Sequence, residues 1–309
     1  MIDFSGQVAI VTGGGRGLGR LYALDLSRRG ASVLVNDVGS SMHGHGCDAS
    51  PADEVVAEIG RAGGIAAPSY QSVASSEGGE AIVREALERF GRLDVVVSNA
   101  GIFHTVAFDE LSVDDWRRML TVHLDGGFYV SQPAFRVMKS QGYGRFVFAA
   151  SSAGLFGQPN SAHYAAAKAG LVGLANVIAI EGAAHGVLAN CVLPFGFSRM
   201  VAETIGDDVE PAGDPFLSAI DPGLVVPLVT FLASRSCELT HHNYSAAAGR
   251  YARVFTGLGE GWLSTAGDTP TADDVAAHLA EVSATEPFTV PTSIFDEVAE
   301  ICQRRGISA

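Results

Sequence analysis

The sequence Val8-Ala9-Ile10-Val11-Thr12-Gly13-Gly14-Gly15-Arg16-Gly17-Leu18-Gly19 lies near the start of the chain and decides the fold. An apolar strand pattern runs directly into a glycine-rich turn, and an amphipathic helical pattern follows. Glycines at such a turn let backbone amides and a helix N-terminus approach a pyrophosphate. The spacing is G-x-x-x-G-x-G, rather than the general dinucleotide pattern G-x-G-x-x-G. We expect a dinucleotide to contact Gly13, Gly15, Arg16, Gly17, Leu18 and Gly19.

Outward from this turn, short and nearly continuously apolar runs alternate with longer helical patterns. The expected strands are Val8–Thr12, Ser32–Asp37, Ile65–Gln71, Leu93–Asn99, Arg145–Ser151 and Leu188–Pro194, with a further strand at Asn243–Ala248. The expected helices are Gly17–Arg29, Pro51–Arg61, Glu77–Phe90, Val113–Lys139 and Ala162–Ala184. Apolar strands alternating with helices predict an α/β fold, a doubly wound parallel sheet of the Rossmann type. Ligands of such sheets bind where the strands end.

Composition limits the classes of function and the organisation of the chain. The chain has 309 residues and a net charge of −14, which argues against a nucleic-acid partner. It shows no secretory signal and no membrane span, and its scattered cysteines suit a reducing compartment, so we expect a cytoplasmic protein. We assign residues 1–249 to the Rossmann domain and residues 250–309 to a helical extension packed on it. Capping-box patterns at Thr271–Asp274 and Ser293–Asp296 predict helix starts in this extension.

The ends of the other strands suggest which dinucleotide binds. The second strand ends at Asp37, whose carboxylate can accept both ribose hydroxyls and would repel a 2′-phosphate, so we expect NAD rather than NADP. Arg16 argues the other way, because a cation in the turn could meet a 2′-phosphate. Residues at the ends of later strands complete the expected cofactor site: Gln71, Ser72, Val73, Asn99, Ala100, Gly101 and Pro194.

A second set of residues supplies acid–base chemistry. Tyr164 and Lys168 are i and i+4 on one helix, so their side chains share a face, and Ser151 ends the fifth strand. A nearby ammonium and a positive nicotinamide ring both favour the phenolate, so we expect the pKa of Tyr164 to fall toward neutrality. Ser151 can hold the reacting oxygen, and Lys168 can also bind the nicotinamide ribose.

Together these motifs resemble the short-chain dehydrogenase/reductase family over about Gly6 to Met200. The resemblance implies a nicotinamide cofactor and Ser151, Tyr164 and Lys168 as catalytic residues. It also implies a dimer or tetramer built on the long helices. The family usually has an Asn in the helix that precedes the fifth strand, where it supports a proton relay. Here the residue is His123, which we assign as catalytic because an imidazole can relay a proton.

The His in place of Asn, Val35–Gly39 with the long loop after it, and Ser198-Arg199-Met200 narrow the resemblance. They are similar to the branch that includes the (3R)-hydroxyacyl-CoA dehydrogenase domain of peroxisomal multifunctional enzyme type 2. The resemblance implies NAD-dependent oxidation of a secondary alcohol, such as a 3-hydroxyacyl-CoA. A hydroxysteroid is the alternative substrate, and a non-catalytic NAD-binding protein is a more distant alternative.

Two segments have no fixed assignment from sequence. The polar segment Gly39–Ala52 holds His43, His45 and Cys47, but we interpret it as a solvated loop and expect no metal site. The segment Phe195–Leu217 is rich in apolar residues and could cover an acyl chain or a ring system, or simply pack as a loop. Arg199 is its one candidate cation for the phosphates of a CoA substrate.

Overall fold

The computed structural model describes residues 1–197 and 214–307. The chain divides into two compact units, Met1–Arg253 and Val254–Ala309. This division lies a few residues beyond the expected boundary at 249, because the strand β8 (Arg250–Val254) still pairs with the main sheet. How the two units pack on each other stays a prediction.

The first unit is built on an eight-stranded sheet with the order β3-β2-β1-β4-β5-β6-β7-β8. Its other strands are β1 (Val8–Thr12), β2 (Ser32–Asn36), β3 (Ile65–Ser69), β4 (Val95–Ser98), β5 (Gly144–Ala149), β6 (Val187–Phe195) and β7 (His242–Ala247). Pairing from β3 through β7 is parallel throughout. β1 lies between β2 and β4, so the strand order reverses there, which is where such sheets bind ligands. The expected doubly wound parallel sheet is confirmed.

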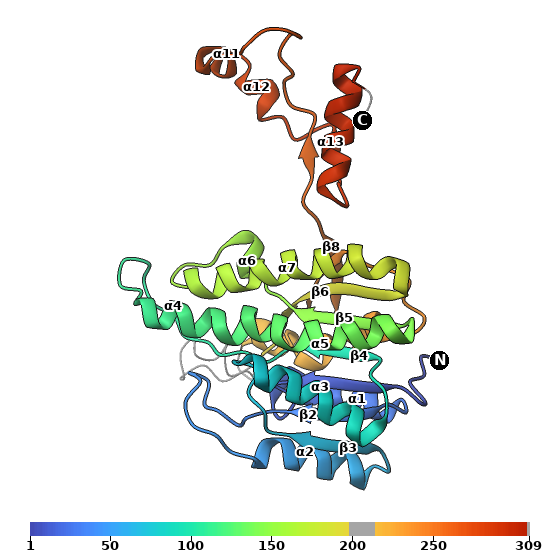
Figure 1. Cartoon of the computed structure of the whole chain (residues 1–309). Coiled ribbons are helices and arrows are strands. Elements are labelled where there is room, and N and C mark those ends of the chain that lie inside the picture. The colour runs from blue at the N-terminus through green and yellow to red at the C-terminus, as the bar shows by residue number, and fades with distance from the viewer. Residues whose placement is uncertain (198–213, 308–309) are drawn as a thin grey trace. The chain divides into compact units, whose positions relative to one another are not determined.

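Helices cover both faces of this sheet (Figure 1). On one face lie α1 (Gly17–Arg28), α2 (Ser50–Arg61) and α10 (Val226–Ala233). The other face carries α3 (Ser76–Phe90), α5 (Gly126–Gln141) and α7 (Ala162–Gly182). Every residue of β1 is buried, and its alternate side chains Ala9 and Val11 pack with Tyr22 and Leu26 of α1. A strand covered on both faces must be apolar on both, which explains the continuous apolar run.

The region expected as one long helix, Val113–Lys139, is interrupted. The helix α4 (Val113–Leu120) passes into a π-helical turn, Thr121–Asp125, before α5 begins. A π turn adds a residue to the helical repeat and shifts the side chains that follow, and such turns often occur at functional sites. The turn contains His123. Shorter helical segments, absent from the sequence prediction, are α6 (Ser152–Phe156), Ala183–His185, α9 (Pro215–Ala219) and Pro222–Leu224.

The second unit is mainly helical, with α11 (Ala272–Ala277), α12 (Leu279–Val282) and α13 (Ile294–Arg305). Both predicted capping boxes are confirmed, one joining Thr271 to Asp274 and the other joining Ser293 to Asp296. A small antiparallel sheet of β9 (Leu258–Gly259) and β10 (Phe288–Thr289) was not expected. The unit is therefore mixed rather than purely helical.

Among the described residues, Ala162–His185 is the one stretch long and apolar enough to cross a membrane by composition. It consists of α7 and the turn after it. This helix packs on β5, β6 and α5 and carries the buried Lys168, so it serves as a core helix of the sheet.

Candidate active site

The glycine turn between β1 and α1 is shaped by close backbone contacts. Gly13 has a φ of +62°, and a Cβ there would lie 2.8 Å from the Cα of Ala100. A Cβ on Gly19 would lie 2.1 Å from the carbonyl oxygen of Gly13. Asn99, at the end of β4, donates from Nδ2 to the carbonyls of Thr12 (3.1 Å) and Gly13 (3.2 Å). The turn therefore has no room for a Cβ at Gly13 or Gly19, and the end of the neighbouring strand β4 holds it in place.

A cavity of about 750 Å³ opens at the carboxyl ends of the strands beside this turn. Most of the residues predicted to hold a cofactor or act in catalysis line it: Gly13, Arg16, Gly17, Leu18, Asp37, Gln71, Ser72, Val73, Asn99, Ala100, Gly101, His123, Tyr164, Lys168 and Pro194. Three predicted residues are not part of the cavity wall. Gly15 and Gly19 pack behind it, and Ser151 hydrogen-bonds to Tyr164.

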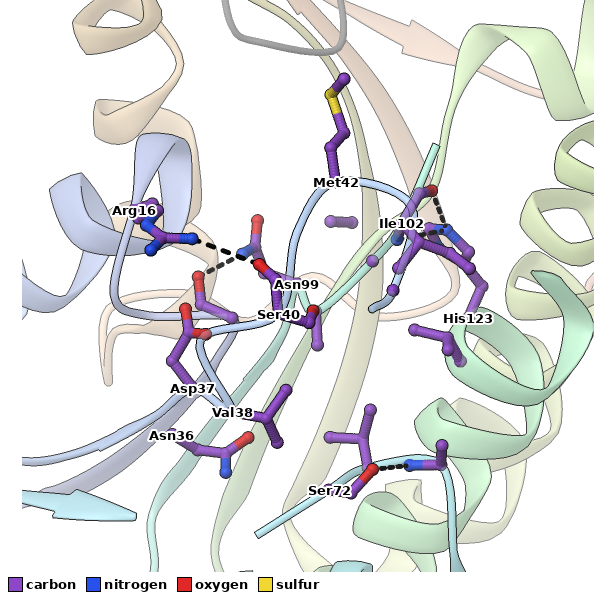
Figure 2. Close-up of a pocket in the computed structure, with 18 of the residues that line it drawn as sticks. Arg16, Asn36, Asp37, Val38, Ser40, Met42, Ser72, Asn99, Ile102 and His123 are labelled. Atoms are coloured by element: carbon purple, nitrogen blue, oxygen red, sulfur yellow. Dashed lines mark hydrogen bonds between the residues drawn. The ribbon is translucent and has the colours of Figure 1, made fainter. Parts of the chain in front are cut away.

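Asp37 lies at one end of the cavity, and two backbone amides fix its carboxylate. The amide of Gly15 donates to Oδ2 at 2.9 Å, and the amide of Gly39 donates to Oδ1 at 2.7 Å. The guanidinium of Arg16 donates to the carbonyl of Ser40 at 3.2 Å (Figure 2). The carboxylate therefore faces the cavity in a fixed position, and Arg16 has a contact with the protein itself.

Tyr164 and Lys168 lie in the first turns of α7, beside the end of β5. The Nζ atom of Lys168 donates to the carbonyl of Ala149 at 2.5 Å and lies 5.6 Å from the centre of the Tyr164 ring. Burial lowers the pKa of the Lys168 ammonium from 10.5 to about 7. The Ser151 side chain also accepts a hydrogen bond from the amide of Ala153. This bond caps the N-terminus of α6, which begins at Ser152.

The electrostatics of Tyr164 differ from the expectation. Burial raises the pKa of its phenol above 10.0, and the hydrogen bond with Ser151 opposes this effect without cancelling it. In the protein without a nicotinamide ring, the pKa of Tyr164 is thus raised, whereas the expected fall included the charge of that ring. The physical reason is that burial disfavours a charge on both neighbours, so Lys168 is also easily neutralised and stabilises a phenolate less than a solvated ammonium would.

His123 lies in the π turn, where its ring is buried. Its Nε2 atom lies 3.1 Å from the amide nitrogen and 2.7 Å from the carbonyl oxygen of Ile102, and its Nδ1 has no partner among the described residues. The ring meets Tyr164 edge-on, with centroids 5.3 Å apart. Burial and then the charge of Lys168 hold the pKa of the imidazole well below 6.5. His123 is therefore neutral, and it braces the Gly101–Ile102 backbone against the tyrosine.

A second histidine contact near the site has no counterpart in the sequence prediction. The Nε2 atoms of His104 and His163 are 3.2 Å apart, and His163 is fully buried directly before Tyr164. The Oδ1 atom of Asp115 lies 3.7 Å from Nε2 of His104. Burial and then His104 lower the pKa of His163, while Asp115 opposes them. In the sequence, His163 stands out only because it directly precedes Tyr164. That position does not indicate His104 as its partner, because the two residues are far apart in the chain.

The loop after β2 is more than the solvated segment that composition suggested. Several of its residues line the cavity: Ser40, Ser41, Met42, Gly44, Gly46 and Cys47. Within the described part of the chain, no three His, Cys, Asp or Glu side chains come together as metal ligands, so the histidines of this loop do not form such a group. Composition could not identify these residues of the cavity wall, because a loop that faces solvent and a loop that faces a ligand can have the same polar composition.

The expected substrate segment is only partly described. Arg199 and the apolar residues Met200, Val201 and Ile205 lie outside the described residues. At its ends, Phe195 is exposed and Leu217 is buried. The amide of Phe197 donates to the carbonyl of Ile220 at 2.7 Å, which joins the end of β6 to the helical region after the gap.

Comparison with known proteins agrees with this fold and site. The family model for short chain dehydrogenases matches residues 7–209. A hydroxyacyl-CoA dehydrogenase of Mycobacterium tuberculosis is 39% identical over 245 residues, which cover 75% of this chain and 74% of the relative. Peroxisomal multifunctional enzyme type 2 of mouse is 44% identical over 248 residues, 80% of this chain and 32% of the relative.

Among solved structures, the full-length peroxisomal multifunctional enzyme type 2 of Drosophila melanogaster superimposes with a TM-score of 0.80 at 32% identity. The match covers 98% of this chain and 50% of that one. The chain therefore spans about a third of the mouse enzyme and half of the fly structure. This protein belongs to the short-chain dehydrogenase/reductase family. Within the family it is similar to the multifunctional enzymes of type 2, as the sequence motifs indicated.

Proposed function

We propose that this protein is an NAD-dependent dehydrogenase that oxidises the 3-hydroxyl group of a hydroxyacyl-CoA. The observation that carries the proposal is that Tyr164 and Lys168 line the same cavity as the glycine turn, while Ser151 hydrogen-bonds to Tyr164. The similarity to a hydroxyacyl-CoA dehydrogenase over three quarters of both chains supports the substrate class.

The residues of the cavity fit a dinucleotide. Gly13 and Gly19 have no room for a Cβ, and the start of α1 lies directly after the turn, where the first amides of a helix can bind a pyrophosphate. Asp37 at one end would accept the adenosine ribose hydroxyls and repel a 2′-phosphate, which favours NAD over NADP. A bound nicotinamide would supply the hydride acceptor for the carbinol carbon of the substrate.

The side chains around that carbon would manage the proton. Ser151 hydrogen-bonds to Tyr164, so a substrate hydroxyl between them would be held by both oxygens. Because burial keeps Tyr164 protonated, it can take the hydroxyl proton of the substrate only as its own phenolic proton leaves, and the neutral amine of Lys168 can accept that proton; in the reverse reaction the protons return along the same route. Lys168, with a pKa of about 7, can exchange a proton at neutral pH and lies beside the phenol. A group with a pKa near the working pH is suited to such a relay.

A spectrophotometric assay at 340 nm tests the proposal directly. We expect NADH to form with 3-hydroxyacyl-CoAs and NAD, and little reduction of NADP. Tyr164→Phe should lower kcat by at least about a thousandfold, because it removes the acid–base group, while NADH still binds. Activity with hydroxysteroids alone would replace the proposed substrate class, and Tyr164→Phe with unchanged turnover would reject the mechanism.

The choice of cofactor has its own test. Replacing Asp37 by Ser removes the charge that would repel a 2′-phosphate, while a hydroxyl remains for the amides of Gly15 or Gly39. We expect the ratio of kcat/KM for NAD to that for NADP to fall by about tenfold or more, as one charge contact is worth one to two kcal/mol. A wild type that prefers NADP would overturn the role given to Asp37.

A further inference from the structure

The loop between β2 and α2, residues 38–48, forms an ordered arch whose ends meet. The amide of Asp48 donates to the carbonyl of Val38 at 2.9 Å, which closes its base. Within the arch, the amide of Ser41 donates to the carbonyl of His45 at 2.8 Å, and the amide of Gly44 donates back to the carbonyl of Ser41 at 3.0 Å. The 38–48 loop therefore has a defined shape of its own.

This arch forms part of the wall of the cofactor cavity, together with Gly101 and Ile102. In Figure 2 the ribbon that carries Ser40 and Met42 passes between Arg16 on one side and Ile102 on the other. Ser40, Met42 and Cys47 of the loop line the same cavity as Asp37 and Tyr164. A dinucleotide that fills this cavity would therefore contact the 38–48 loop.

Two contacts hold the far end of the loop, and both come from elements distant in sequence. The amide of Phe103 donates to the carbonyl of Met42 at 3.0 Å. The Nη1 atom of Arg118, on α4, lies 3.2 Å from Nε2 of His45. Because an arginine only donates, His45 must accept with a neutral ring. Asp115 accepts from Nη2 of the same Arg118 at 2.9 Å, which orients the guanidinium toward the loop.

The 38–48 loop has further contacts with the protein: Arg16 donates to the carbonyl of Ser40 at 3.2 Å, and Gly44 lies against the side chain of Ile102. Its residues from Ser41 to Asp48 are exposed except for the half-buried Met42, and none contributes an apolar side chain to the core. Segments with few buried apolar contacts open at low free-energy cost, and such loops commonly control ligand release. The contact between Arg118 and His45 is the side-chain contact that ties the far end of the loop to α4.

We propose that the 38–48 loop closes over the bound dinucleotide, that Arg118 fastens it through His45, and that its opening limits the rate of cofactor release. The proposal rests on the proposed binding of NAD and makes Arg118 and His45 positioning residues for the cofactor. The receiving segment also reaches the catalytic end, because the Phe103 ring packs edge-on against Tyr164 with centroids 5.1 Å apart. The closed loop thus contacts the Ile102–Phe103 segment, which also packs against Tyr164.

The test is the rate of NADH release, measured by stopped-flow displacement with excess NAD and followed by NADH fluorescence. Arg118→Gln and His45→Ala each remove the fastening contact, and we expect release three- to fivefold faster, the loss of about one exposed charged hydrogen bond. His45→Gln keeps an acceptor for Arg118 and should stay near the wild-type rate. The matched control is Arg117→Gln, because Arg117 is an exposed neighbour on the same helix and its side chain is in none of the hydrogen bonds or ion pairs found among the described residues.

A second measurement reports on the loop itself. Cys47 is an exposed thiol in the arch, whereas Cys191 and Cys237 are buried, so Cys302→Ser leaves Cys47 as the accessible thiol of the chain. We expect NADH to slow the reaction of Cys47 with a thiol reagent, and Arg118→Gln to reduce that protection by several fold. A purely structural role of Arg118 would leave this protection unchanged.

The outcomes separate the two proposals. If wild-type protein binds NADH but its release rate and the protection of Cys47 are the same in Arg118→Gln and His45→Ala, the role of the loop is wrong and the proposed dehydrogenase stands. If the wild type binds neither NADH nor NADPH, the proposed function fails, and the role of the loop fails with it.

Discussion

Replacing Lys168 by Met should stabilise the cofactor-free protein while it abolishes turnover. Lys168 is 5% exposed, and its ammonium donates to one carbonyl, that of Ala149. None of the ion pairs found in the described part of the chain includes it. A buried cation without a carboxylate partner costs free energy, and a methionine of similar shape removes that cost.

The magnitude follows from the pKa. Burial lowers the pKa of Lys168 from 10.5 to about 7, and each unit corresponds to about 1.4 kcal/mol. Below pH 7 the lysine is charged in both states, and the folded protein bears the whole penalty, roughly 5 kcal/mol. Between pH 7 and 10.5 the unfolded chain binds more protons than the folded one, so the stability of the wild type rises with pH. Loss of the hydrogen bond to Ala149 offsets about 1 kcal/mol of the gain.

Urea denaturation of both proteins without cofactor checks this reasoning. At pH 7 we expect Lys168→Met to be more stable by about 3 kcal/mol, and the difference should shrink steadily as the pH approaches 9.5. Groups away from Lys168 titrate in both proteins alike and cancel in the comparison. Equal dependence on pH in the two proteins, or a less stable variant at pH 7, would refute the claim that Lys168 is buried at such a cost.

Substitutions at three further positions test the packing, two beside the site and one between α1 and α10. Gly101→Ala places a Cβ 2.3 Å from Cε1 of the buried His123 ring, so we expect about 1–3 kcal/mol lower stability and a fall in kcat, measured by thermal denaturation and steady-state kinetics. His123→Asn should keep kcat within about tenfold, because an amide can serve the N–H and C=O of Ile102 together, whereas His123→Leu should lose far more. Burial raises the pKa of Asp25, but hydrogen bonds from Thr230 and two arginines outweigh it, so the pKa is lowered below 3.8. This carboxylate therefore stabilises the fold above that pH and loses its effect as the pH falls. We expect Asp25→Asn to cost about 2 kcal/mol at pH 7 and less below pH 4, by denaturation across that range.

The sheet and most of the cavity could be predicted because their signals are local. Parallel strands buried on both faces must be apolar along their whole length, so β1, β4 and β5 are visible in the sequence. The glycines of the turn and the i, i+4 pair of Tyr164 and Lys168 depend on backbone geometry within a few residues. The carboxyl ends of such strands gather at one edge of the sheet, so the wall residues Asp37 and Asn99 could also be named in advance.

The parts that escaped prediction depend on groups distant in the chain. His45 meets Arg118, and His104 meets His163, only because the fold brings a loop, a helix and a strand end together. The π turn at His123 lies within a pattern that favours a regular helix, and its ring reaches back to the backbone of Ile102. The residues that flank each of these positions in the sequence do not predict such contacts.

The opening stretch from Val8 to Gly19 by itself determined the class of fold and the place of a dinucleotide, because a strand, a tight turn and a helix start each require particular residues at fixed spacing. The sequence also determined which residues meet at the reaction end. The tertiary structure alone decided their electrostatics: the depressed pKa of Lys168 and the raised pKa of Tyr164 come from burial. It also turned the polar 38–48 loop into a cavity wall. Burial and enclosure are properties of the whole packed chain, whereas spacing along the sequence fixes only what lies within reach of a few bonds.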